Sequence, residues 1–477
     1  MRIADIAADI VDDITRMAEG VQDQASQMFE PTLRLGVTGL SRAGKTVFIA
    51  SLVANLLDRG RMTGLVAAAE GRIEAAALRP HPDRSAPRFE WEAHMDALRA
   101  KDPHWPEGTR HVSRLRISFR VRPSGWFSGL SGPRAVHLDI VDYPGEWLLD
   151  LPLMNQRFPD WSTRALGDAE APVRAPHAAG WRAALAGVDP AAPYDEAAAQ
   201  HLAQAFAGYL KAAKTAGLSG LAPGRFLMPG DLEGSPALTF APLPGGRAPR
   251  GSLAAEFDKR FEAYKSAVIR PFFADHFARL DRQVVLVDVL GALDAGPGAL
   301  EDLRQALGRI LEAFRPGDAS WLARMLGARR IDRILFAATK ADHIHHSQHD
   351  RLTGMLSELL REGATRAAFS GAKTASMAIA SLRATTETET TRDGRTIGLV
   401  RGRLMPDGRE AAVHPGDLPE NPADALALAR SGALEWPDGG FRAPPFQAPR
   451  LTARPGEGPP HIRLDRAAQF LLGDFLQ

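Results

Sequence analysis

The hydrophobic positions of the chain fall into short stretches with strand spacing, separated by longer stretches with helical spacing. From residue 33 to 38 apolar side chains occupy every second position, which predicts a strand. From residue 49 to 56 they recur at helical spacing, and Gly60 follows as a stop signal. A strand that leads directly into a helix is typical of an α/β domain.

Further apolar stretches predict more strands of the same sheet. They lie at residues 115–119, 135–142, 284–287, 332–339 and 376–380. The stretch 332–339 contains Ile334, Leu335, Phe336 and two alanines in a row of five, as expected of a parallel strand that is buried on both faces. The predicted fold class is therefore α/β with a mostly parallel sheet.

A phosphate-binding pattern stands between the first predicted strand and helix. Residues 39–46 read Gly-Leu-Ser-Arg-Ala-Gly-Lys-Thr and fit G-x-x-x-x-G-K-[ST] at every fixed position. Such a loop wraps phosphates with backbone N–H groups at a helix N-terminus, while its lysine bridges the β- and γ-phosphates and its hydroxyl binds Mg²⁺. A chance glycine-rich turn is the alternative, which the flanking strand and helix disfavour. The predicted nucleotide contacts here are Gly39, Ser41, Arg42, Ala43, Gly44, Lys45, Thr46 and Val47.

An acidic partner for the metal follows the strand 135–142. Asp142 ends that strand, and Gly145 completes an Asp-x-x-Gly pattern, the γ-phosphate-sensing signature of GTPases. We predict that Asp142 is the Walker-B carboxylate and that Thr46 is its metal-binding partner. Asp139 is predicted to be structural, because at strand spacing it points to the opposite face. Asp288 is the rival Walker-B residue, but no turn and glycine follow it in the same way.

A base-recognition pattern follows the strand 332–339. Thr339-Lys340-Ala341-Asp342 fits [NT]-K-x-D, in which the aspartate accepts two hydrogen bonds from guanine and the lysine stem covers the ring. Threonine in place of the commoner asparagine loosens the support of this loop. The last base-contacting loop is predicted at Ser381 and Leu382, after the strand 376–380.

With these motifs the sequence resembles the YcjX-like family of bacterial P-loop GTPases. The resemblance rests on the segments 39–46, 142–147, 282–288, 339–343 and 462–465. It implies a G domain with inserted segments that binds GTP or GDP with Mg²⁺. It also implies an envelope-stress context and a membrane-associated partner protein.

The spacing of the motifs predicts large insertions. Lys45 and Asp142 are 97 positions apart, and Asp142 and Asp342 are 200 apart, far more than a minimal G domain of about 100–200 residues accommodates. We expect a three-layer P-loop NTPase G domain with a helical insertion and a small β-rich insertion. The expected segments are an N-terminal helix (1–30), the first G-domain part (31–150), the helical insertion (151–280), the second G-domain part (281–384), a β-hairpin-rich insertion (385–455) and the C-terminal helix of the G domain (456–477).

Hydrolysis depends on residues around the γ-phosphate. Glu146 stands where many GTPases have glutamine, so it is the candidate that positions water, and its charge predicts slow intrinsic turnover. Arg42 is a candidate for neutralising transition-state charge in cis, with a solvent-facing loop arginine as an equal alternative. Thr109 is the candidate switch residue that meets Mg²⁺, and Ser113 is its weaker rival. The predicted catalytic set is Lys45, Glu146, Arg42 and Thr109.

Composition narrows the class of protein. The 477 residues carry a net charge of +1, which offers no field that would hold nucleic acid, and they include no cysteine for disulfides or thiolate chemistry. No apolar stretch reaches the roughly 18–20 residues of a membrane helix, and early aspartates argue against a signal peptide. We therefore expect a cytoplasmic protein, peripheral to the inner membrane only through a partner.

Two further patterns are better explained by structure than by a functional site. His345 and His349 have the i, i+4 spacing of a metal pair, but a solvated helix start is the favoured interpretation. An apolar stripe over residues 3–17 predicts an N-terminal helix that packs on the protein or on a partner.

Three functions stay open on the sequence. The first is a GTP hydrolase that works as a molecular switch, and the second is a nucleotide-regulated interaction protein with negligible turnover. The third is a P-loop ATPase or kinase, which the Thr339–Asp342 and Asp142–Gly145 patterns disfavour. The patterns give neither the partner nor the oligomeric state.

Overall fold

The computed structural model describes residues 30–477, apart from residues 41, 109–110, 125–131, 246–248, 314–330, 369–371, 393, 406, 438–439 and 453. The expected N-terminal helix and two predicted site residues, Ser41 and Thr109, lie outside the described part. Among the described residues, no helix has both the length and the hydropathy needed to cross a bilayer.

A seven-stranded sheet forms the centre of the molecule, in the order β2-β3-β4-β1-β5-β6-β7. Strands β4, β1, β5, β6 and β7 run parallel, and β3 pairs antiparallel with both β2 and β4. The strands are β1 (Thr32–Gly39), β2 (Ile73–Arg79), β3 (Ser113–Val121), β4 (Arg134–Asp142), β5 (Arg282–Val287), β6 (Arg333–Ala338) and β7 (Lys373–Ala378). The mostly parallel α/β sheet predicted from the hydrophobic pattern is confirmed.

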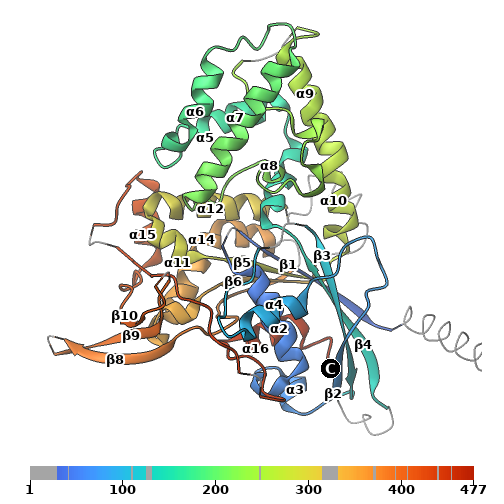
Figure 1. The fold of residues 1–477 in the computed structure, drawn as a ribbon, viewed down its shortest axis with the longest axis vertical. Helices are drawn as coiled ribbons and strands as arrows, with labels where there is room; N and C mark the ends of the chain where they lie inside the picture. The colour runs from blue at the N-terminus through green and yellow to red at the C-terminus, as the bar shows by residue number, and fades with distance from the viewer. Residues whose placement is uncertain are drawn as a thin grey trace, which may run out of the picture.

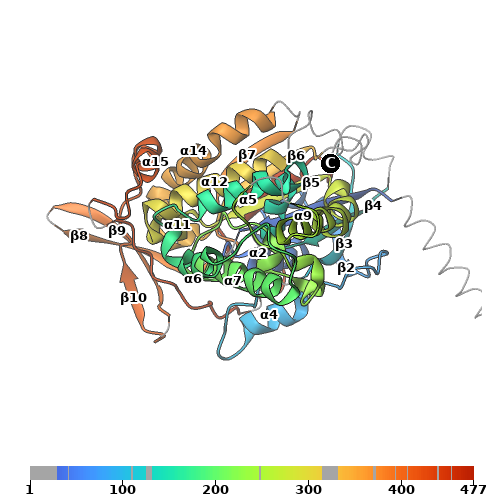
Figure 2. The same ribbon diagram turned by 90° about the horizontal axis from the view of Figure 1, so that it is seen from above.

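Helices cover both faces of the sheet and make three layers (Figures 1 and 2). One face packs against α2 (Lys45–Leu57) and the predicted C-terminal helix, α16 (Leu464–Leu472), around a core that includes Leu35, Phe48 and Leu471. The other face packs against α11 (Val289–Ala295), α12 (Pro297–Ala313) and α14 (His349–Ala368). Alternate side chains of one strand, such as Val284 and Val285, enter these two cores, as strand geometry requires.

A helical region stands above the sheet in Figure 1. Its main helices are α5 (Phe158–Asp168), α6 (Ala175–Ala186), α7 (Glu196–Thr215), α8 (Gly224–Leu227), α9 (Leu253–Tyr264) and α10 (Arg270–Asp275). Apolar side chains recur at helical spacing in the two longer helices, at Leu202, Phe206 and Leu210 of α7 and at Phe257, Phe261 and Tyr264 of α9. A π-helical turn over Lys265–Ile269 separates α9 from α10, where Pro271 lacks an N–H to donate. Aromatic side chains fill the interior of this helical region.

A small antiparallel sheet projects from the side of the molecule, at the left in Figure 1. It consists of β8 (Thr386–Arg392), β9 (Arg395–Arg403) and β10 (Glu410–Val413), in the order β10-β9-β8. Helix α15 (Pro422–Arg430) follows and packs near α12 and α14. The segment that follows residue 385 therefore forms antiparallel hairpins.

The remaining short elements connect these parts. They are α3 (Val66–Ala69), α4 (Trp91–Arg99) and the short helical turns η1 (Arg59–Arg61), η2 (Gly145–Asn155), η3 (Gly230–Leu232), η4 (Pro236–Leu238), η6 (Phe277–Arg279), η7 (Ala341–His343) and η8 (His346–Gln348). Of these, η2 matters most for function, because it directly follows the Asp-x-x-Gly pattern and runs into the helical region.

Asp150 fastens η2 to the helical region. Its Oδ1 accepts a hydrogen bond from the Gly224 N–H at 2.6 Å, and its Oδ2 accepts one from the Tyr264 hydroxyl at 2.7 Å. Burial raises the pKa of Asp150 from its ordinary value of 3.8 to about 6, although these two hydrogen bonds act in the opposite direction.

We expect the contribution of Asp150 to stability to be present in acid and to be lost as the pH rises through 6. Because its folded pKa lies above its unfolded pKa, the folded protein binds more protons in this range, so the free energy of unfolding falls with rising pH. The change amounts to about 2–3 kcal/mol. Urea unfolding of the wild type and Asp150→Asn from pH 3.5 to 7.5 measures it. A difference between the two proteins that does not vary with pH would contradict the assignment.

Candidate nucleotide-binding site

The predicted motifs meet at one edge of the sheet. The phosphate loop follows β1, the Asp-x-x-Gly segment follows β4, and the base-recognition segment follows β6. Because β1, β4, β5, β6 and β7 are parallel, all of their carboxyl ends lie at this edge. Ligands of open α/β sheets bind at such an edge.

The phosphate loop has the backbone that its glycines suggest. Gly44 has φ 76° and lies in the left-handed region directly before α2, which begins at Lys45. A Cβ at Gly44 would meet no heavy atom within 4 Å, so glycine is needed there for its conformation while the space beside it stays open. Arg42 also has a positive φ, of 64°. The N–H groups of the first turn of α2, including that of Val47, thus stand at a helix N-terminus suited to an anion.

Lys45 and Asp142 form an ion pair at the centre of the edge. The Asp142 side chain is buried at 1% exposure, and the Ser113 hydroxyl lies 3.5 Å from its Oδ2. Next to Lys45, the Thr46 hydroxyl donates a hydrogen bond to the Glu107 carbonyl oxygen at 3.2 Å. Of the two switch candidates, the structure describes only Ser113, which it brings to Asp142.

These residues fit a nucleotide phosphate with Mg²⁺. A carboxylate and a hydroxyl oxygen are the hard ligands that Mg²⁺ takes from proteins in phosphate sites. The buried Asp142 already binds a cation, the Lys45 ammonium, so the position favours positive charge. Gly44, where an added Cβ would meet no heavy atom within 4 Å, directly precedes Lys45 at the start of α2.

Gly145 and Glu146 lie against the phosphate loop. A Cβ at Gly145 would come 2.3 Å from the Gly39 carbonyl oxygen, so only glycine permits this approach. Glu146 is buried, and its Oε1 accepts a hydrogen bond from Lys214 at 2.7 Å. The Arg42 guanidinium donates to the Thr215 carbonyl oxygen at 3.2 Å. The end of α7 therefore reaches two of the predicted catalytic side chains, Arg42 and Glu146.

The base-recognition segment is held by the neighbouring strand end. The Thr339 N–H donates to the Val287 carbonyl oxygen at 3.0 Å, and Lys340, with φ 61°, pairs with Asp288. Asp288 also caps α11 by accepting from the Gly291 N–H at 3.0 Å. The rival Walker-B carboxylate therefore orients the base-recognition lysine, a role that the sequence analysis did not assign to it.

The loop after β7 contacts the base-recognition segment. Ser381 and Leu382 are both buried, and the Ala384 N–H donates to Asp342 Oδ2 at 2.8 Å. Backbone hydrogen bonds join residues 380 and 383 to the C-terminal segment 460–462. Strand β7 spans Lys373–Ala378 and so begins three residues earlier than predicted. Its first residues are polar, because β7 is the outermost strand of the sheet.

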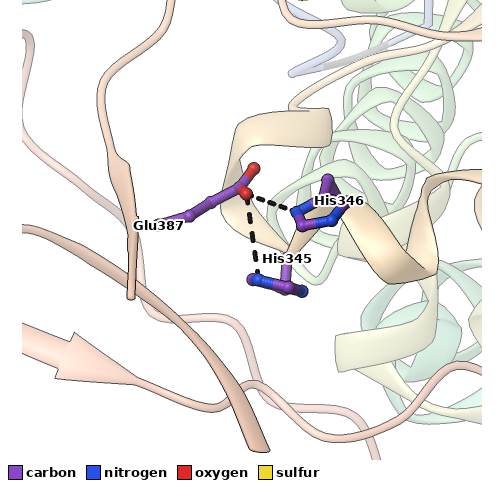
Figure 3. A group of neighbouring side chains, drawn as sticks. All are labelled: His345, His346 and Glu387. Atoms are coloured by element: carbon purple, nitrogen blue, oxygen red, sulfur yellow. Dashed lines mark hydrogen bonds and ion pairs between the residues drawn. The ribbon is translucent and has the colours of Figure 1, made fainter. Parts of the chain in front are cut away.

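The histidine cluster differs from the predicted solvated helix start. His349 is buried and its Nε2 lies 2.8 Å from the Ala341 carbonyl oxygen, so it does not pair with His345. Figure 3 shows that His345 and His346 instead face Glu387 of β8, at 3.8 Å and 2.6 Å. Only His346 is exposed. The solvated interpretation is wrong for His345 and His349. His345 contacts the small sheet, whereas His349 contacts the base-recognition segment.

The fold and this edge together define a P-loop nucleotide-binding protein with a G-domain type of α/β sheet. Within this class the chain belongs to the YcjX-like family, DUF463, whose family model matches residues 33–476. It is 38% identical over 459 residues to the Ras-like GTPase YcjX of Escherichia coli (strain K12), covering 93% of this chain and 96% of that protein. It is 35% identical over 469 residues to the Ras-like GTPase YcjX of Shewanella oneidensis, covering 93% and 95%.

Proposed function

We propose that this protein hydrolyses GTP to GDP and phosphate with Mg²⁺ and acts as a molecular switch. The observation that carries the proposal is the meeting of the Lys45–Asp142 pair and the Asp342 segment at one sheet edge. Two relatives that match almost the whole chain bear the name GTPase, which supports the same reaction. Phosphate release from GTP and from ATP with Mg²⁺ tests the proposal, and a preference for ATP would overturn it.

In this reaction each group has a defined task. Lys45 and the N–H groups at the start of α2 bind the phosphates, and Thr46 and Asp142 hold Mg²⁺, with Ser113 and Thr109 as the switch candidates. Mg²⁺, when bound, neutralises charge on the phosphate oxygens. Asp342 accepts the guanine N–H groups, while Lys340 covers the ring and the Ser381–Leu382 backbone meets the base oxygen. Glu146 orients a water molecule that attacks the γ-phosphorus. The bond between the γ-phosphorus and the oxygen that bridges it to the β-phosphate breaks in the same reaction.

The cellular setting belongs to the same proposal. The family resemblance supports a role in bacterial envelope stress, with a membrane-associated partner protein that reads the nucleotide state. The protein itself would work in the cytoplasm. Pull-down of membrane fractions with the GTP-loaded and GDP-loaded protein would separate nucleotide-dependent partners from background.

We expect Glu146→Ala to lower kcat by about 10²-fold, because a group that positions the attacking water contributes about that much. Glu146→Gln should lose less, since an amide still accepts a hydrogen bond from water. GDP affinity should not change in either protein. Single-turnover phosphate release and GDP titration measure both quantities. An unchanged rate in both variants would remove Glu146 from the mechanism.

A further inference from the structure

The last turn of α7 reaches the phosphate loop from the helical region. Lys214 and Thr215 both end this 20-residue helix, and each contacts a different side of the site. Lys214 binds Glu146 at 2.7 Å, and the Thr215 carbonyl oxygen accepts from Arg42 at 3.2 Å. These contacts join segments that are 68 and 173 positions apart along the chain. The helical region is therefore part of the site and not a remote appendage.

Helix α7 holds this end in a fixed place. Its apolar face is buried along its length, from Ala199 to Ala213, and Tyr209 stacks on Trp181 with ring centroids 5.5 Å apart and planes inclined by 8°. At its other end Asp195 caps the helix by accepting from the Ala198 N–H at 2.7 Å. A side chain on a packed and capped helix is positioned more closely than one on a loop.

Lys214 compensates the negative charge of the buried Glu146 carboxylate. A buried carboxylate costs free energy unless a cation or hydrogen bonds compensate it, and a bound triphosphate would add more negative charge nearby. The Lys214 ammonium donates a hydrogen bond to Oε1 of this carboxylate. Among the described residues, Lys214 is the cation in contact with Glu146, since the Arg42 guanidinium donates to Thr215 instead. The pair is neutral as a unit, and the contact with Lys214 is made by one of the two carboxylate oxygens, Oε1.

We propose that Lys214 is a positioning residue for hydrolysis, supplied in cis by the helical region. It holds Glu146 by one oxygen and offsets its charge, so that the other oxygen orients the attacking water beside the γ-phosphate. The inference rests on the proposed function, because it assigns the helical region a part in that same reaction.

The experiment measures single-turnover phosphate release, GDP affinity and melting temperature for Lys214→Gln, Lys214→Arg and the wild type. We expect Lys214→Gln to lower kcat about tenfold, since one charge-assisted hydrogen bond is lost. GDP affinity and KM should stay within twofold of the wild type. Lys214→Arg should recover most of the rate. Lys211→Gln is the matched control, because Lys211 lies one turn earlier on α7 and is exposed.

A double variant completes the test. If Lys214 acts through Glu146, then Glu146→Gln with Lys214→Gln should be no slower than Glu146→Gln alone. An unchanged or faster Lys214→Gln overturns the inference. The inference is also overturned if Lys214→Gln loses GDP affinity by the same factor as the rate and has a lower melting temperature, because the Lys214–Glu146 pair would then be structural only. A wild type that releases no phosphate from GTP overturns the proposed function itself.

Discussion

Lys45→Ala is expected to lower phosphate release from GTP by about 10²–10³-fold, because it removes the preorganised cation at the phosphates where charge develops. In the structure this ammonium is paired with the buried Asp142, at the open space beside Gly44. The side chain is only 10% exposed, so water cannot substitute for it at low cost. Phosphate release with Mg²⁺ under saturating GTP measures the effect.

The same substitution leaves Asp142 buried without its cation, which costs up to about 3–5 kcal/mol in the nucleotide-free protein. Loss of turnover in Lys45→Ala alone would therefore not separate chemistry from folding. Lys45→Arg keeps a cation beside Asp142, but its planar fork does not reproduce the ammonium geometry. We expect it to keep a melting temperature near that of the wild type and still to lose turnover. Lys373→Ala, at an exposed position at the start of β7, is the control. Normal turnover in Lys45→Arg and Lys45→Ala would contradict the assigned role.

The parts of the fold that follow from local sequence were predicted. The phosphate loop is specified by its own glycines between an alternating strand and an amphipathic helix, so β1 and α2 lie where the pattern puts them. Strands β4 and β6 are central and apolar along most of their length. Strand β7 begins three residues and ends two residues before the predicted 376–380, because its first residues, including Lys373, are polar on the edge strand of the sheet and carry no apolar signal.

The parts that depend on distant segments were not predicted. His345 is buried because β9 passes over it, so closely that a Cβ at Gly398 would lie 2.4 Å from the His345 ring. Nothing within ten residues of His345 reports that contact. Lys214 likewise ends an ordinary amphipathic helix, and only the packing of α7 brings it to Glu146. Asp288 was weighed as a metal ligand, whereas its pairing with Lys340 depends on the adjacency of β5 and β6.

The guanine preference is expected to depend on Asp342 more than on any other side chain. Its carboxylate is buried, and its Oδ2 is held by the Ala384 N–H at 2.8 Å, so it is oriented before a base arrives. Two hydrogen bonds from guanine to a charged acceptor are together worth about 3 kcal/mol or more. Asp342→Asn should therefore weaken GDP binding by about 10²–10³-fold.

The same variant carries its own control, which follows from the chemistry of the base. Xanthine presents a carbonyl oxygen where guanine has its exocyclic amine, and the side-chain amide that replaces the Asp342 carboxylate can donate to that oxygen. Xanthosine diphosphate should therefore bind the variant more tightly than the wild type, which a misfolded protein would not do. Calorimetric titration of both proteins with GDP, ADP and xanthosine diphosphate gives the comparison. If GDP affinity survives the substitution, or if ADP binds the wild type as tightly as GDP, then Asp342 does not select the base. The edge of β6 would in that case hold a nucleotide only by its phosphates, through Lys45 and the start of α2.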